Sequence, residues 1–157
     1  AKMKGAKLDI SKWKRPSPET IPCEAKASGL YMICTMSKHA AQAKGCSDAM
    51  MFDYRGYVAE ATGANIFFVK DGEVHTPIPD AILNGITRQT VIGMLKDMQI
   101  KVHERRIEAS ELEGFQQCFL TGTAAEVTPV GQIGDYNFEV GDLTKRIATE
   151  YERMVRA

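Results

Sequence analysis

One lysine, one carboxylate and two loops of small residues stand out as groups that could do chemistry together. Lys26 lies in the run EAKASGLY, just ahead of a helical pattern, so its amine is held at a helix entrance rather than on a free loop. An amine in such a place can form an imine with an aldehyde. Glu60 lies at a strand end in EATGAN and could pair with a protonated ring nitrogen. Lysines and glutamates are mostly solvated surface groups. A chemical role for Lys26 and Glu60 is therefore inferred only together with the two loops.

The first loop, LNGITRQTV, has the features of a phosphate site. Gly85 permits a close approach of the backbone, and Ile86 and Thr87 begin a helix whose free amides and positive dipole end favour an anion. The Thr87 hydroxyl could add a further donor. The alternative is that Thr87 only caps the helix.

The second loop, LTGTAAE, follows directly from an apolar strand. Successive amides at Gly122, Thr123 and Ala124 could form a concave site for a phosphate or for a substrate carboxylate, with the Thr123 hydroxyl assisting. The alternative is ordinary turn chemistry, because small residues are common where a strand enters a loop.

The elements that must position these groups follow from periodicity and turn residues. Asp71 and Gly72 form a preferred two-residue turn between two strands. The first strand, 7–13, is expected at an edge of the sheet, before Pro16 and Pro18. Strands and helices mix without strict alternation, which indicates an α/β or mixed α+β domain with a mixed sheet. The patterns predict strands at 7–13, 48–53, 57–61, 65–70, 73–76, 100–107, 116–122 and 126–130, and helices at 28–44, 87–98, 109–113 and 143–155.

Length and charge narrow the class of protein. The 157 residues make one domain, 1–157, large enough to bury about two-thirds of its unfolded surface. Twenty basic residues balance twenty acidic ones, so no long-range field favours nucleic acid or an anionic membrane as a partner. A small molecule, or a cofactor with its own local cradle, fits better.

Neither the cysteines nor the histidines suggest a metal site. Cys23, Cys34, Cys46 and Cys118 stand singly, without the paired spacing of zinc sites, and are expected to be the reduced, packed cysteines of a cytoplasmic protein. The histidines, to which we assign no role, are His39, His75 and His103.

An imine-forming lysine, a carboxylate for a pyridinium and two phosphate-type amide cradles together describe pyridoxal 5'-phosphate bound through Lys26. Glu60 would keep the ring nitrogen protonated, so that the ring withdraws electrons from the substrate α-carbon. Lys26 would first hold the aldehyde and then act as the general acid/base.

The motifs EAKASGLY, YVAEATGANIF, ILNGITRQTV and FLTGTAAEVTPV, in this order, resemble the class IV, fold type IV pyridoxal phosphate aminotransferases, most of all the branched-chain amino acid type. The resemblance implies the large C-terminal domain of that fold, a mixed sheet forming a pseudo-barrel with surrounding helices. It also implies transamination of leucine, isoleucine and valine with 2-oxoglutarate, in branched-chain amino acid biosynthesis, by a homodimer or larger homo-oligomer.

The resemblance also assigns roles to residues. It implies that Lys26 forms the Schiff base and that Tyr31 hydrogen-bonds near the ring hydroxyl, although Tyr31 could be an ordinary packed aromatic. Glu60 matches the carboxylate at the pyridine nitrogen. The remaining matches are Gly63 and Asn65 in the surrounding loop; Leu83, Gly85, Ile86 and Thr87 at the ring and phosphate; Gly122 and Thr123 at the phosphate; and Thr123 and Ala124 near the substrate carboxylate.

The chain departs from the family pattern at Leu30, where an asparagine is common, and at Ala64, where a glutamate or serine is common. The larger departure is at the front. Family members have an N-terminal domain that supplies an arginine to the phosphate and aromatic residues to the side-chain pocket, and nothing of this kind precedes Ala1. We therefore expect a C-terminal domain that binds the cofactor weakly and transaminates poorly by itself.

Other functions fit parts of the pattern. D-amino acid aminotransferase and 4-amino-4-deoxychorismate lyase share the lysine and the GITR helix start, whereas TGTAAE and AKASGLY look more like the branched-chain type. A different class would be a non-catalytic α/β interaction module, in which Lys26 is a surface residue, Glu60 is solvated and Thr87 merely caps a helix.

Overall fold

The computed structural model describes residues 4–19 and 28–156, apart from the side chains of 28–31. Its centre is a nine-stranded mixed sheet with the order β3-β2-β1-β8-β7-β4-β5-β6, in which β9 pairs with β8. The strands are β1 (Ala6–Ile10), β2 (Asp48–Phe52), β3 (Val58–Ala61), β4 (Asn65–Lys70), β5 (Glu73–Pro77), β6 (Val102–Arg105), β7 (Gln117–Gly122), β8 (Glu126–Ile133) and β9 (Tyr136–Asn137). The helices are α1 (Ser28–Ala43), α2 (Ile86–Asp97), the 3-10 helix η2 (Ala109–Gly114) and α3 (Asp142–Val155).

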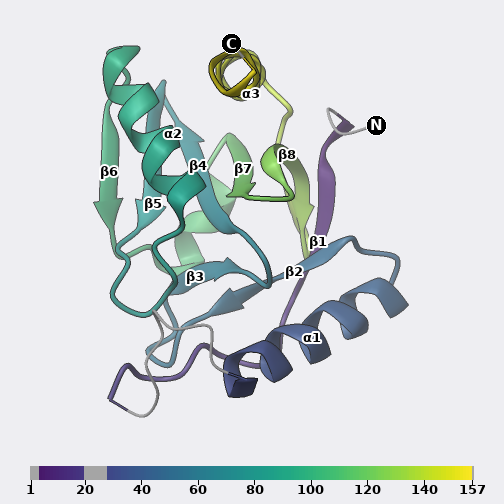
Figure 1. Cartoon of the computed structure of the whole chain (residues 1–157). Coiled ribbons are helices and arrows are strands. Elements are labelled where there is room, and N and C mark those ends of the chain that lie inside the picture. Colours follow the sequence, from purple (N-terminus) through teal and green to yellow (C-terminus); the bar gives the residue numbers. More distant parts are fainter. Residues whose placement is uncertain (1–3, 20–27, 157) are drawn as a thin grey trace.

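The sheet curls into a half-barrel, so that β3 at one end of the strand order returns toward the other end (Figure 1). A backbone hydrogen bond supports this return, because the Val58 amide donates to the Ile107 carbonyl at 2.8 Å. In the short turn between β3 and β4, the Ala61 amide donates to the Ala64 carbonyl at 2.9 Å. This turn places the end of β3 beside the start of β4, where Glu60 and Asn65 lie.

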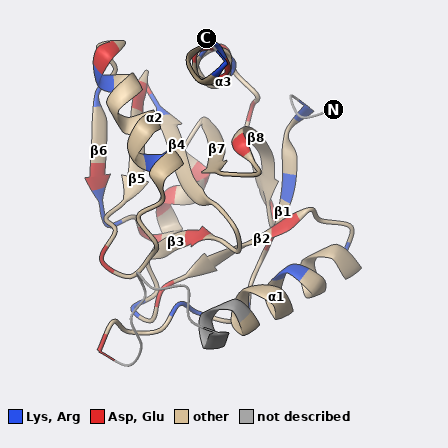
Figure 2. Ribbon diagram, in the orientation of Figure 1, with Lys and Arg blue, Asp and Glu red and all other residues tan. Residues whose placement is uncertain are grey.

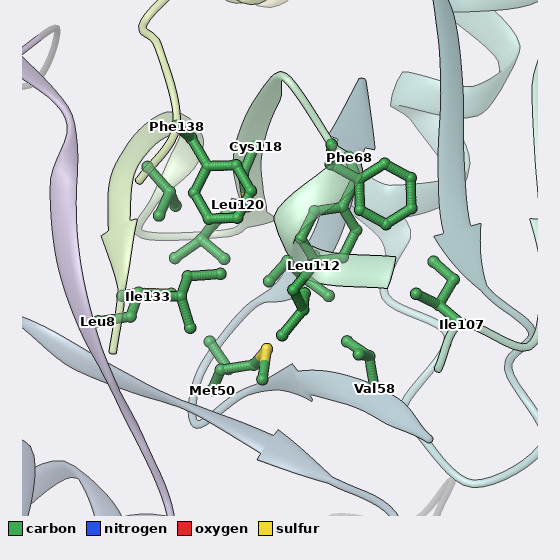
Figure 3. Packing of buried hydrophobic residues seen from close by; sticks show 14 residues of the cluster. Leu8, Met50, Val58, Phe68, Ile107, Leu112, Cys118, Leu120, Ile133 and Phe138 are labelled. Atoms are coloured by element: carbon green, nitrogen blue, oxygen red, sulfur yellow. The ribbon is translucent and has the colours of Figure 1, made fainter. Parts of the chain in front are cut away.

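One hydrophobic core fills the inside of the curl and a second lies under the helices. Phe68 belongs to the inner core, together with Leu112 and Leu120 (Figure 3). Its ring stacks on that of Phe115 at 4.6 Å between centroids. Phe67 points to the other face and stacks on Phe119 at 4.9 Å, beneath α2 and α3. Because β4 is buried on both faces, it is a continuous apolar run rather than an alternating one.

The predicted mixed α/β architecture is confirmed, and the predicted position of the first strand is wrong. β1 lies inside the sheet rather than at an edge, because it pairs in parallel with β2 on one side and with β8 on the other. It also ends at Ile10, so that Trp13, 38% exposed, lies beyond it. The short strand β9 was not predicted.

Most of the other predicted elements are confirmed within a few residues. The turn between β4 and β5 has positive φ at both Asp71 (52°) and Gly72 (77°), as a type I′ hairpin turn requires. Basic and acidic residues are interspersed along the ribbon (Figure 2). No helix in the described part of the chain is both long enough and apolar enough to span a membrane.

Candidate active site

Glu60 is a buried carboxylate rather than a solvated one. It lies on β3, whose residues are all buried, and its own exposed fraction is 6%. Its Oε1 lies 3.2 Å from Nε of Arg15, which is 4% exposed. Arg15 is held there by backbone pairing with β2, since its amide donates to the Phe52 carbonyl at 2.8 Å. The pair brings together a segment after β1 and a strand more than forty residues later.

Burial changes the proton affinity of this carboxylate. It raises the pKa of Glu60 from 4.5 to about 7, while the Arg15 charge and a backbone hydrogen bond at Leu83 act in the opposite direction. A carboxylate in this position is costly to ionise without a second positive charge. A second cationic group beside this carboxylate would therefore favour its ionised form.

Asn65 connects this carboxylate to the loop before α2. Its Nδ2 donates to the Leu83 carbonyl at 2.8 Å and lies 3.4 Å from Oε2 of Glu60. Asn65 is 6% exposed, so these are its main polar contacts in a dry environment. The side chain fixes the loop 83–87 against the start of β4.

The loop 83–87 leads into a helix start that no side chain caps in the described structure. Gly85 is the N-cap of α2, and the first turn contains no acidic residue. Thr87 is therefore not the cap, contrary to the alternative above, and is 9% exposed within the first turn. Ile86, in contrast, is 84% exposed. The first amides of this twelve-residue helix are left for another partner.

The side chain of Asn65 leaves no room for a side chain at position 85. A Cβ added there would lie 2.7 Å from Oδ1 of Asn65, closer than real contacts allow. Any side chain would push the loop away from Asn65. Gly85 thus allows the helix start and the β4 start to meet.

The second predicted loop lies beside the Gly63–Asn65 segment. Gly122 ends β7, and a Cβ on it would lie 3.1 Å from the Gly63 carbonyl oxygen and 3.5 Å from Cβ of Ala64. Thr123 and Ala124 are exposed in the turn that follows.

Thr121 is the ladder partner of Asn65. Its Oγ1 is buried and has no hydrogen-bond partner in the described structure. An orphaned hydroxyl, two close-approach glycines and an uncapped helix fit a phosphate-bearing ligand.

The structure thus brings together most of the residues predicted to form the site: Glu60, Gly63, Asn65, Leu83, Gly85, Ile86, Thr87, Gly122, Thr123 and Ala124 lie on three neighbouring loops and strand ends. Lys26 and the Tyr31 side chain lie outside the described residues. The helix that follows Lys26 is described, and on it Cys34 contacts Arg15, whose Nη1 lies 3.9 Å from Sγ. This face of α1 therefore borders the Arg15–Glu60 pair.

Sequence reasoning missed Arg15. It lies in the basic run KWKRP, where nothing distinguishes it from neighbouring surface cations. Its one local signal is the proline after it, which favours the extended backbone that pairs with β2. Its role depends on β3, which is distant in the sequence.

Comparison with known proteins shows the family of this chain. The family model for amino-transferase class IV matches residues 1–133, so this chain belongs to the class IV aminotransferases. It is 43% identical over 157 residues to a probable branched-chain-amino-acid aminotransferase of Rickettsia conorii, covering 98% of this chain and 54% of the relative. The chain therefore spans about half the length of the curated relatives it matches.

Solved structures of this family have the same fold. The branched-chain aminotransferase of Thermoproteus uzoniensis with norvaline has a TM-score of 0.93 and 38% identity, covering 98% of this chain and 52% of its own. The branched-chain amino acid aminotransferase of Escherichia coli has a TM-score of 0.92 and 35% identity, covering 96% of this chain and 52% of its own. The curled mixed sheet predicted from the motifs is confirmed.

Proposed function

We propose that this chain forms the cofactor-binding part of a pyridoxal 5'-phosphate-dependent aminotransferase that acts on branched-chain amino acids. The observation that carries the proposal is the Asn65 side chain, which joins the buried Glu60 carboxylate to the Leu83 carbonyl, just before the uncapped start of α2. A site for a cationic ring nitrogen and a site for an anion thus share one support. Pyridoxal phosphate has both groups in one molecule.

Glu60 would hold the proton on the ring nitrogen. When bound, the cofactor supplies an electron sink for the substrate α-carbon. Arg15 and Asn65 orient the carboxylate, and burial keeps water from competing for it. The structure contradicts the interaction-module alternative on this point, because that alternative requires a solvated Glu60.

The phosphate would be bound by two groups of amides. One is the start of α2 at Ile86 and Thr87, where the helix has no other cap. The other is the turn after Gly122, with the Thr123 hydroxyl and Ala124 exposed toward a substrate carboxylate. The exposed Ile86 side chain and Leu83 would pack on the ring.

Lys26 is proposed as the Schiff-base lysine and as the base that moves the substrate proton. Its support is its place directly before α1, whose Cys34 side touches Arg15. Tyr31, on the same helix, is proposed to hydrogen-bond near the ring hydroxyl. Gly63 would only permit the close approach of the two loops.

The substrate assignment is supported by the ligands of the relatives. The solved neighbours include complexes with norvaline, with 4-methylvaleric acid and with a phosphopyridoxyl adduct of glutamate. We infer aliphatic amino acids such as leucine as donors and 2-oxoglutarate as the acceptor. The free thiols of Cys34, Cys46 and Cys118 agree with a reducing cytoplasm, and we also propose that the complete enzyme is a homo-oligomer.

Borohydride reduction of the cofactor-treated chain, followed by peptide mass mapping, tests this proposal. We expect a pyridoxyl adduct on Lys26, absent from Lys26→Ala and retained in the matched control Lys38→Ala on the exposed side of α1. An adduct on another lysine, or none at saturating cofactor, would contradict the assignment. The adduct is detected without turnover. The test is therefore valid even if this chain, which spans about half the length of its relatives, does not catalyse the reaction.

A further inference from the structure

A second cluster of chemically active side chains lies on the edge of the sheet. His75 on β5 and His103 on β6 are direct partners in the parallel ladder, and their rings stack at 4.6 Å with an interplanar angle of 15°. Glu73 lies two residues before His75, on the same face of β5. Its Oε1 lies 2.7 Å from Nε2 of His103.

This cluster is separate from the candidate active site. His75 is opposite Phe68 in the β4–β5 ladder and lies 5.6 Å from Phe115 between ring centroids, so it faces the side of the inner core. Asn65 shares its face with Phe67, which belongs to the outer core. The two sites are thus on opposite faces of the sheet.

We propose that Glu73, His75 and His103 bind a divalent transition-metal ion of the zinc type. Each residue offers one ligand atom, and these atoms lie within 4.8 Å of one another. To bind one ion, the side chains would rotate from their present stacked arrangement so that these three atoms converge. The three residues are half-buried at the edge of the sheet, so an ion can enter and can keep water on its remaining positions.

The ligand set selects the kind of ion. Two imidazoles and one carboxylate suit Zn²⁺, Ni²⁺ or Cu²⁺, and match the protein ligands of open zinc sites. Mg²⁺ and Ca²⁺ prefer sites made of oxygen atoms alone and would bind poorly.

Arg105 controls access to His75. Its Nε donates to Nδ1 of His75 at 3.2 Å, while its Nη2 is paired with Oε1 of Glu111 at 2.7 Å. The arginine therefore occupies a nitrogen lone pair that a metal could use and places a positive charge beside the site. An ion must displace Arg105 or bind through the other ring nitrogen.

Binding of a metal ion would hold the edge strand β6 to β5. In the described structure β6 pairs with β5 alone, through the four residue pairs from Val74–Val102 to Pro77–Arg105. An ion held by both strands stabilises the folded form by mass action. The melting temperature of the chain should therefore rise with metal concentration.

Calorimetric titration of the chelator-treated chain with ZnCl₂ tests the proposal. We expect one ion per chain, and a loss of affinity of more than about tenfold in His75→Asn and in His103→Asn. His39→Asn, which changes an exposed histidine on α1, is the matched control and should bind as the parent does. Arg105→Met should bind more tightly than the parent, because the competing donor and its charge are gone.

Two outcomes would overturn the proposal: no binding by the parent or by Arg105→Met at millimolar ZnCl₂, or binding that is equal in the parent, His75→Asn and His103→Asn. The second outcome would point to the thiols instead. Circular dichroism in the absence of metal shows whether each variant is folded. Borohydride labelling of Lys26 should be unaffected by every one of these variants, so this test is independent of the proposed cofactor site.

Discussion

Arg15 and Glu60 form an ion pair in which Nε and Oε1 are 3.2 Å apart and both side chains are almost completely buried. A buried pair of this kind contributes little net stability, because desolvation of the two charges offsets their attraction. Its value lies in position: Arg15 contacts Oε1 and Asn65 contacts Oε2, so the carboxylate is held in one orientation.

The first prediction concerns pH. Because the pKa of Glu60 is raised from 4.5 to about 7, the folded chain holds this proton more tightly than the unfolded chain. The stability that the proton on Glu60 contributes is complete below pH 4.5. This contribution, about 3 kcal/mol, is lost as the pH rises through 7. The difference in unfolding free energy between the parent and Glu60→Gln should therefore fall by this amount from pH 4.5 to pH 7.5, measured by urea denaturation. A difference that is constant with pH would show that the pKa is not raised.

The second prediction concerns Arg15, the ion-pair partner of Glu60. Arg15→Leu leaves the buried carboxylate without its cation and should cost about 3 kcal/mol of unfolding free energy at pH 8. The double variant Arg15→Leu with Glu60→Gln should be more stable than Arg15→Leu alone, because no uncompensated charge remains. If the two single losses simply add in the double variant, the residues are not coupled.

The third prediction compares two glycines of the α2 region. Gly85→Ala places a Cβ 2.7 Å from Oδ1 of Asn65 and should lower cofactor affinity by about tenfold or more. Gly93→Ala lies inside α2, where a Cβ meets nothing within 4 Å, and should stabilise the chain by up to about 1 kcal/mol with unchanged affinity. Absorbance titration with pyridoxal phosphate and thermal unfolding measure the two effects. Equal affinities in the two variants would contradict the role given to Gly85.

The fourth prediction concerns Asn65. Asn65→Ala removes the donor to the Leu83 carbonyl and should cost about 1–3 kcal/mol of stability, together with a clear loss of cofactor affinity. Asn137→Ala, on the exposed position of β9, is the control and should change neither. Retention of full affinity by Asn65→Ala would show that the carboxylate and the helix start do not depend on this link.

Much of this arrangement could be predicted from the sequence, because it is encoded locally. The β4–β5 hairpin follows from its apolar run and from Asp71–Gly72, and the start of α2 follows from Gly85 and the helical period after it. The order of four motifs identified the family, which the family model confirms.

The remainder depends on contacts between distant segments. The interior place of β1 arises from parallel pairing with β2 and β8, and no local pattern distinguishes this from an edge strand. Arg15 becomes part of the site only because β3 lies beside it. His75 and His103 are 28 positions apart in the sequence and become neighbours only through the register of β5 and β6.

The interior place of β1 also has a consequence for how the chain folds. β1 precedes both of its partners during synthesis, and Val130 of β8, which pairs with Ala6, is made more than a hundred residues later. Until then, β1 has at least one unpaired edge, which is prone to pair with another chain. Such long-range parallel pairing slows folding, so the formation of the β1–β8 ladder is expected to be a late step and aggregation is expected to compete with it.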